Sequence, residues 1–272
     1  MKSPFVRAIA LAMVVSAAFA TARAQYASGV VNYTAGTGAA VGYDNPSVAL
    51  GEPSRVTPGE FGGPVDPFSP PYLSSQLVSV GTGGSLTVRF ALPISNDPAH
   101  AHGLDFLVFG NSGFIVTNAF DENFNYIGTP ATDGSLFGAG GTTRVSVSAD
   151  GNTFFTLNPA LAPAVDALFP TDGSGNFGKP VDPSLNNGSF AGLTLEGIRN
   201  VYAGSGGGAG YDLGWAQDGN GNPVTLTDIS YVKVEVLGGK VELDAFSAVV
   251  PEPATWALLG LGLGALIVVR RR

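Results

Sequence analysis

The side chains that could carry chemistry in this chain are mostly carboxylates. Of the 272 residues, positions 25–250, which we call the body, contain 20 Asp or Glu and two His residues, and the chain has no Cys. Carboxylates beside Gly and Asn in loops suit Ca²⁺, which takes about six to eight oxygen ligands. The lack of Cys excludes a thiol nucleophile, a disulfide framework and a CxxC metal motif.

Three carboxylates lie in apolar strand or strand-edge settings. They are Asp105, Asp212 and Asp244. Burying an isolated carboxylate is costly, so each one needs a cation or several hydrogen-bond donors. These three residues are therefore candidate calcium ligands.

The two histidines, His100 and His102, form an HxH pair that could hold Zn²⁺ if it lay on a strand. A third ligand would come from Asp97 or a distant carboxylate. The polar run before the pair favours a solvated loop instead. A catalytic zinc site with three histidines is excluded by their number.

Hydrolase chemistry has no clear signature in the chain. Glycoside hydrolysis needs two carboxylates about 5–9.5 Å apart, and 20 candidates do not single out a pair. Asp121 and Glu122 share a loop with Phe120, Phe124 and Tyr126, but we favour a loop whose aromatic residues pack on the body. No Gly-x-Ser-x-Gly elbow precedes a helix.

The charge balance excludes nucleic acid as a partner. The body holds 7 basic and 20 acidic residues, a net charge of −13. Such a surface repels phosphate backbones.

The first 24 residues have the pattern of a signal peptide. Lys2 and Arg7 precede an apolar run over 8–20, and Ala22 and Ala24 occupy the positions that signal peptidase reads. We expect cleavage before Gln25.

The last 22 residues have the pattern of a membrane-anchored tail. Pro251, Glu252 and Pro253 precede an apolar segment, 254–269, and the chain ends in Arg270, Arg271 and Arg272. Sixteen helical residues span roughly 24 Å, so we expect a transmembrane helix. The arginines stay cytoplasmic, which places the body on the far side, as an inner-membrane-anchored intermediate.

This tail resembles the PEP-CTERM sorting signal. The resemblance implies recognition by an exosortase, processing near Pro251–Pro253, and display at the surface or in the extracellular matrix of an exopolysaccharide-producing Gram-negative bacterium. It thus adds exosortase as a processing partner, beside the signal peptidase that the first 24 residues imply, and exopolysaccharide as a candidate ligand.

The body is predicted to be one all-β domain of antiparallel sheets. Apolar and polar residues alternate over 86–92, 145–148 and 231–236, and 104–109 has the apolar pattern of a strand buried on both faces. A last strand is expected over 241–249, one turn over 46–50 and a short helix over 193–202. The stretches 111–141 and 158–192 are either elaborate functional loops or contain small elements.

The body also resembles a group of exported bacterial cell-surface proteins, on the segments 43–51, 104–111, 145–151, 206–213 and 242–246. The resemblance implies an antiparallel β-sandwich, a jelly roll of galactose-binding-like type. In similar modules a structural Ca²⁺ joins an early loop to the last strand, which here implies Asp44, Asn45, Glu52 and Asp244 as ligands.

We interpret the chain as a non-catalytic, exported surface or matrix protein that binds glycan and uses calcium structurally. Two alternatives remain open. One is an enzyme that degrades extracellular polysaccharide, and the other is a self-associating structural surface protein.

Overall fold

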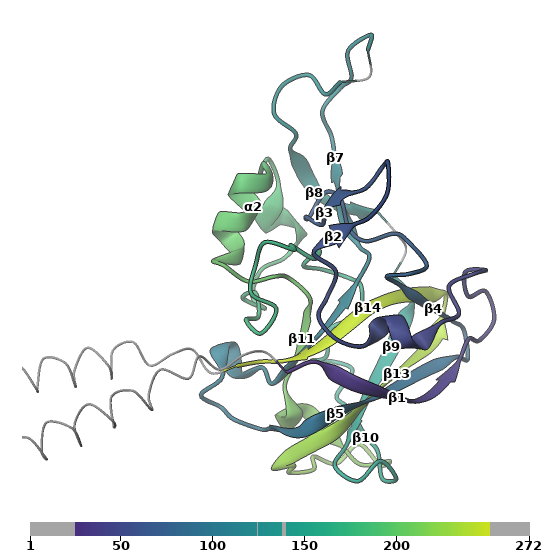
Figure 1. Cartoon of the computed structure of the whole chain (residues 1–272). Coiled ribbons are helices and arrows are strands. Elements are labelled where there is room, and N and C mark those ends of the chain that lie inside the picture. Colours follow the sequence, from purple (N-terminus) through teal and green to yellow (C-terminus); the bar gives the residue numbers. More distant parts are fainter. Residues whose placement is uncertain (1–24, 124, 138–139, 251–272) are drawn as a thin grey trace, which may run out of the picture. The chain divides into compact units, whose positions relative to one another are not determined.

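Alternating apolar and polar residues build the body into antiparallel sheets (Figure 1). The computed structural model describes residues 25–123, 125–137 and 140–250. A six-stranded sheet has the order β1-β5-β13-β9-β10-β12. Its strands are β1 (Ala27–Thr34), β5 (Ser85–Ser95), β13 (Asp228–Gly238), β9 (Thr142–Ser148), β10 (Phe155–Leu157) and β12 (Ala216–Gln217).

A four-stranded sheet has the order β11-β6-β14-β4. Its strands are β11 (Ala209–Tyr211), β6 (Phe106–Gly110), β14 (Lys240–Ala248) and β4 (Val78–Gly81). Two small hairpins complete the described strands, β2 (Val56–Thr57) with β3 (Gly63–Pro64), and β7 (Gly113–Val116) with β8 (Thr132–Phe137). The predicted all-β, antiparallel class with few short helices is confirmed.

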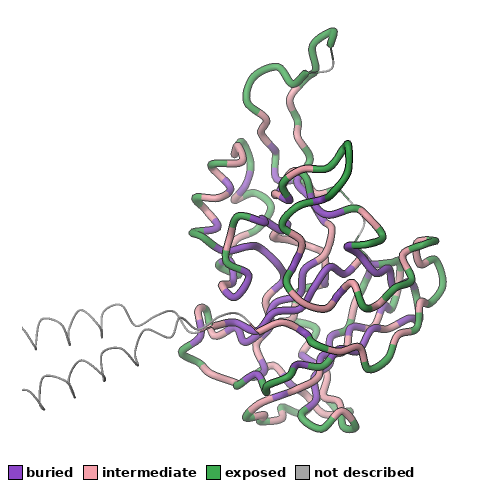
Figure 2. The backbone as a smooth tube through the Cα atoms, in the orientation of Figure 1, coloured by how far each residue is buried: buried purple, intermediate pink, exposed green. Residues whose placement is uncertain are grey.

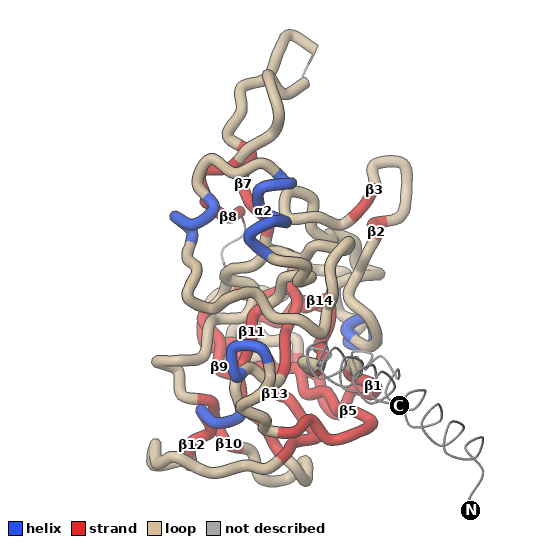
Figure 3. The backbone as a smooth tube through the Cα atoms, turned by 90° about the vertical axis from the view of Figure 1, so that its left-hand side faces the viewer, coloured by secondary structure: helices blue, strands red, loops and turns tan. Residues whose placement is uncertain are grey.

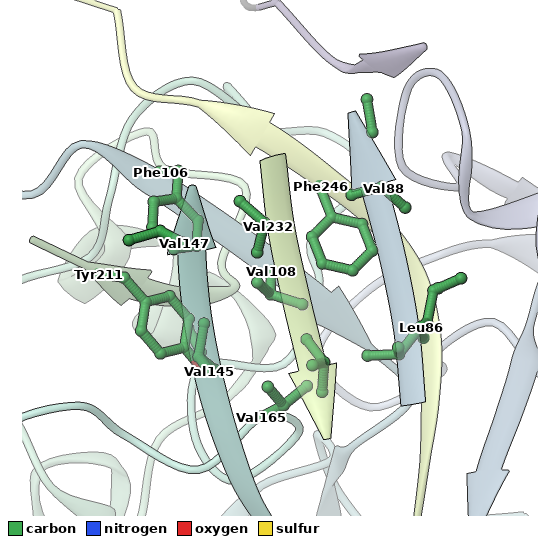
Figure 4. Close-up of a cluster of buried hydrophobic side chains, with 14 of the residues drawn as sticks. Leu86, Val88, Phe106, Val108, Val145, Val147, Val165, Tyr211, Val232 and Phe246 are labelled. Carbon is green, nitrogen blue, oxygen red and sulfur yellow. The ribbon is translucent and has the colours of Figure 1, made fainter. Parts of the chain in front are cut away.

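One hydrophobic core joins the two larger sheets. Buried side chains of both sheets belong to the same cluster and point toward one another in Figure 4, among them Leu86, Val147 and Val232 from the larger sheet and Val108 and Phe246 from the smaller. Burying such side chains supplies most of the stabilisation, roughly 25 cal/mol per Å² of apolar surface.

Strand β6 is buried on both faces, as its apolar pattern predicts. Phe106 and Val108 face the shared core, whereas Leu107 and Phe109 join a second cluster with Phe177, which covers the opposite face.

A third apolar cluster packs α2 (Leu195–Tyr202) together with β7, and both of these elements lie in the upper part of Figure 3. The cluster comprises Phe114, Val181, Phe190, Ile198 and Tyr202. The helical elements are η1 (Pro46–Ala49), η2 (Ala101–Gly103), η3 (Asn187–Phe190), α2 (Leu195–Tyr202) and η4 (Leu213–Trp215). The stretch 111–141 thus contains small elements, β7 and β8, and 158–192 contains η3.

The first described residues of the body meet the end of β14. The carbonyl of Gln25 accepts a hydrogen bond from the Ala248 amide at 2.7 Å, and Tyr26 pairs with Ser247. Just beyond β14, the Val249 amide donates to the Asp105 carbonyl and the Val250 amide to the Gly178 carbonyl. The chain is therefore hydrogen-bonded into the fold up to Val250.

Candidate functional site

The predicted buried carboxylate Asp105 has several protein donors. Its side chain is fully buried and accepts hydrogen bonds from the Asp97 amide at 3.0 Å and the Leu213 amide at 2.9 Å. His100 Nδ1 lies 2.8 Å from the same carboxylate. The solvated loop expected for His100 is therefore wrong, because this side chain is buried against Asp105.

Asp244 lies at a bulge of β14 and holds an early loop in place. The register of β14 against β6 shifts between Leu243 and Ala245, which marks the bulge. The buried Asp244 carboxylate accepts hydrogen bonds from the amide and the hydroxyl of Ser54, both at 2.8 Å. An early loop and the last strand are thus joined by a direct contact.

The other candidate calcium ligands are dispersed over separate local contacts. Asn45 accepts from the Ser47 amide as the cap of η1, and Asp212 accepts from the Gly214 amide as the cap of η4. Glu52 pairs with Arg55 at 2.6 Å, and Asp44 is exposed. Within the part of the chain that the structure describes, no three His, Asp or Glu side chains gather to hold a metal ion. Calcium binding stays a prediction.

Burial changes the acidity of two carboxyls in this region. Desolvation raises the pKa of Asp244 to about 7, and the Ser54 hydrogen bonds offset it in part. Desolvation also raises the pKa of Asp166 to about 7. A hydrogen bond from Ser112 lowers this pKa in part, and the charge of Glu242 raises it further.

We expect these two carboxyls to make the body less stable as the pH rises from about 4 to about 7. An unfolded Asp has a pKa of about 3.9, so the folded state binds the protons more tightly. Their stabilising contribution is complete below about pH 4 and lost above about pH 7. The midpoint of thermal unfolding should be lower at pH 8 than at pH 5, and Asp244→Asn should reduce this difference. The exposed Asp133→Asn should leave it unchanged, and an equal reduction in both variants would contradict the assignment.

The strongest candidate for a binding site is a cleft of about 490 Å³ beside the β2–β3 hairpin. Three partly or fully exposed aromatic rings line it. Phe61 is 87% exposed, Tyr72 45% and Phe137 41%. Figure 2 shows the exposed hairpin loop in green at this part of the molecule. Exposed rings around a concavity are typical of a ligand-binding surface rather than of a core.

Local backbone features position these rings. The Asp66 carboxylate accepts from the amides of Phe68 and Ser69, at 2.8 and 3.0 Å, and this turn carries the chain along the cleft. Gly113 lets the Phe137 ring lie across β7, because a Cβ there would come within 2.4 Å of the ring. The Tyr72 hydroxyl donates to the Phe61 carbonyl at 3.1 Å, which ties the hairpin loop to the next segment.

One buried polar atom of a residue at this cleft has no hydrogen-bond partner. Thr57 lines the cleft and is 4% exposed, and its hydroxyl is the only buried side-chain polar atom of the described residues without a hydrogen bond. Leaving such a group unpaired costs about 1–3 kcal/mol.

A second cleft, of about 700 Å³, adjoins the first. Its walls come from β7, from the arm 117–123 and 125–131, which projects beyond β7 and β8 in Figure 1, and from the start of α2. Tyr126 of the arm lines it and stacks on Phe120, with ring centroids 4.5 Å apart. Glu196 and Arg199 of α2 line it as well.

An ion pair anchors the α2 side of the second cleft. Arg199 Nε and Nη2 lie 2.7 and 3.1 Å from the two carboxylate oxygens of Asp172. Burial alone would raise the pKa of Asp172, but hydrogen bonds from Arg199 and Ser174 lower it below its usual value. Desolvation raises the pKa of the neighbouring Asp66.

Sequence reasoning did not find the first cleft. Phe61, Phe68 and Tyr72 stand in a Pro- and Gly-rich segment, where the chain has no periodicity that would assign them to a core face. Aromatic residues recurring in such a segment were the available signal.

Comparison with known proteins identifies the tail. Residues 249–272 match the PEP-CTERM protein-sorting motif. The chain carries a PEP-CTERM sorting motif. The PEP-CTERM motif implies processing by an exosortase and an exported, secreted or cell-surface protein. No curated protein matches the chain.

Several predictions about the PEP-CTERM tail and the leader concern parts outside the described residues. These are the signal peptide 1–24 with Ala22 and Ala24, the motif residues Pro251 to Pro253, the transmembrane helix 254–269 and the arginines 270–272. Within the described residues, none of the helices has the length and apolar character needed to span a bilayer.

Proposed function

We propose that this PEP-CTERM protein is a non-catalytic glycan-binding protein of the surface or extracellular matrix, with its binding site in the aromatic cleft beside the β2–β3 hairpin. The exposed rings of Phe61, Tyr72 and Phe137 around one concavity carry the proposal. Sugar rings have apolar C–H faces that stack on aromatic rings, and their hydroxyls need hydrogen-bond partners.

The polar groups of the cleft fit such a ligand. Asp66, Ser69 and Asn111 line the same concavity as the rings. Mostly apolar walls with a few placed polar groups are the usual composition of a small-molecule site.

The location of the protein supports the same function. A PEP-CTERM protein is exported, and the exopolysaccharide of its host would then be within reach. We further propose that the body, 25–250, is a single domain and that its two larger sheets form a β-sandwich of jelly-roll, galactose-binding-like type. The shared hydrophobic core supports this arrangement.

The first test is calorimetric titration of the full chain, in lipid nanodiscs, with uncharged oligosaccharides and with the exopolysaccharide of the host. We expect saturable binding. Phe61→Ala and Tyr72→Ala should each weaken it by about tenfold, equivalent to about 1.4 kcal/mol. The exposed Leu237→Ala on β13 is the matched control and should bind as the wild type does.

Two results would decide against this function. Absence of heat with every glycan would favour a self-associating structural protein, which concentration-dependent assembly would support. New reducing ends during incubation with polysaccharide would favour the enzyme.

A further inference from the structure

The two clefts meet at a shared boundary. Asp66, Phe68 and Ser69 line both of them. A volume of roughly 300–1,000 Å³ accommodates one small ligand. Each cleft alone falls in this range, at about 490 and about 700 Å³. Joined, they offer more room than one or two sugar rings fill.

Aromatic rings line both parts of this joined space. Phe61, Tyr72 and Phe137 line the first cleft, Phe68 lies at the boundary, and Tyr126 lines the second cleft. Stacking surfaces in both clefts provide contacts for successive units of one chain rather than for a single ring.

The charges of the second cleft disfavour an anionic ligand. Asp66 and Glu196 line it, and the Arg199 guanidinium makes two hydrogen bonds to Asp172. The body as a whole has a net charge of −13. Exposed like charges repel over about 8–10 Å at physiological salt, so a polymer rich in uronic acid or sulfate would be repelled.

We infer that the two clefts form one continuous groove, which takes an internal stretch of an uncharged polysaccharide several sugar units long. This inference rests on the proposed glycan-binding function and adds the ligand class, an extended neutral polymer. The boundary at Ser69 is the point where the ligand passes from one cleft to the other.

The test measures how affinity depends on ligand length. The probes are uncharged gluco-, manno- and galacto-oligosaccharides of two and six units, and a six-unit polygalacturonate fragment, titrated into the full chain. In the neutral series that binds, the six-unit oligosaccharide should bind at least about tenfold more tightly than the two-unit one. The second cleft would then add about 1.4 kcal/mol or more of binding free energy. The polygalacturonate fragment should bind more weakly than the neutral six-unit probe.

Thr129→Trp places a bulky side chain in the second cleft and separates this inference from the function on which it rests. Thr129 is exposed and lines the second cleft but not the first, so the variant should fold and leave the first cleft open. It should still bind two units, but the gain for six units should disappear. Ser184→Trp, at an exposed residue outside both clefts, is the control and should keep the gain.

Each outcome bears on one of the two proposals. Equal affinities for two and six units, or a full gain in Thr129→Trp, would overturn the continuous groove while glycan binding stands. Tighter binding of polygalacturonate would overturn the neutral ligand class. No binding of any neutral probe would overturn both the groove and the proposed function.

Discussion

Replacing Asp105 with alanine is expected to lower the free energy of unfolding by at least about 3 kcal/mol. The variant leaves the Asp97 amide, the Leu213 amide and His100 Nδ1 without their acceptor. Each buried donor that loses its partner costs about 1–3 kcal/mol. Asp105 has no exposed surface, so solvent does not reach these donors to replace the lost acceptor. Urea unfolding of the full chain measures the loss.

The control for Asp105→Ala is Asp182→Ala. Asp182 is exposed and accepts from the Ser184 amide, so its removal should cost well under half as much. Asp105→Asn keeps one acceptor oxygen and should fall between the two. Similar losses for Asp105→Ala and Asp182→Ala would show that the buried contacts at Asp105 contribute little.

Replacing Arg199 with methionine is expected to lower the free energy of unfolding by about 3 kcal/mol. Asp172 is 2% exposed, and removal of its partner leaves a buried carboxylate with only Ser174 as a donor. Breaking a buried ion pair costs about 3–5 kcal/mol, and we expect the lower end because the Arg199 side chain is 39% exposed. Urea unfolding measures this change.

A surface ion pair provides the comparison. Arg144 pairs with Glu235 at 3.0 Å, and both side chains are more exposed than Asp172. Arg144→Met should therefore change the stability by no more than about 1 kcal/mol. In the double variant Asp172→Asn, Arg199→Met, part of the stability should return, because no unpaired charge is left. If Arg199→Met lowers the free energy of unfolding no more than Arg144→Met does, then solvent compensates the unpaired charge of Asp172.

The strands of the body follow from local sequence pattern. Val232, Val234 and Val236 are buried, and the residues between them are not, as the alternation predicts. The uninterrupted apolar stretch of β6 predicted burial on both faces, and the clusters on its two sides bear this out. Such patterns are readable because strand side chains alternate between faces with a period of two.

The contacts of the site depend on residues far apart in the chain, and pattern alone does not contain them. The polar run around His100 gave no sign that the chain folds back to place its ring on Asp105. Likewise Asp244 was expected to need a cation or several donors, and Ser54, 190 residues earlier, supplies two hydrogen bonds. The aromatic cleft draws Phe61 and Phe137 from two separate hairpins.

The hydrogen bonds near Val250 have a mechanical consequence. Any pull on the chain beyond Val250 reaches the body through β14, which is paired on one side with β6 and on the other with β4. Because a force along the strand loads the bonds of both ladders together, β14 should resist shear rather than unzip one bond at a time. A tether at this end would thus be attached to an interior strand. When a bound polymer is pulled, β14 would carry the force, and β14 is paired with a neighbouring strand on each side.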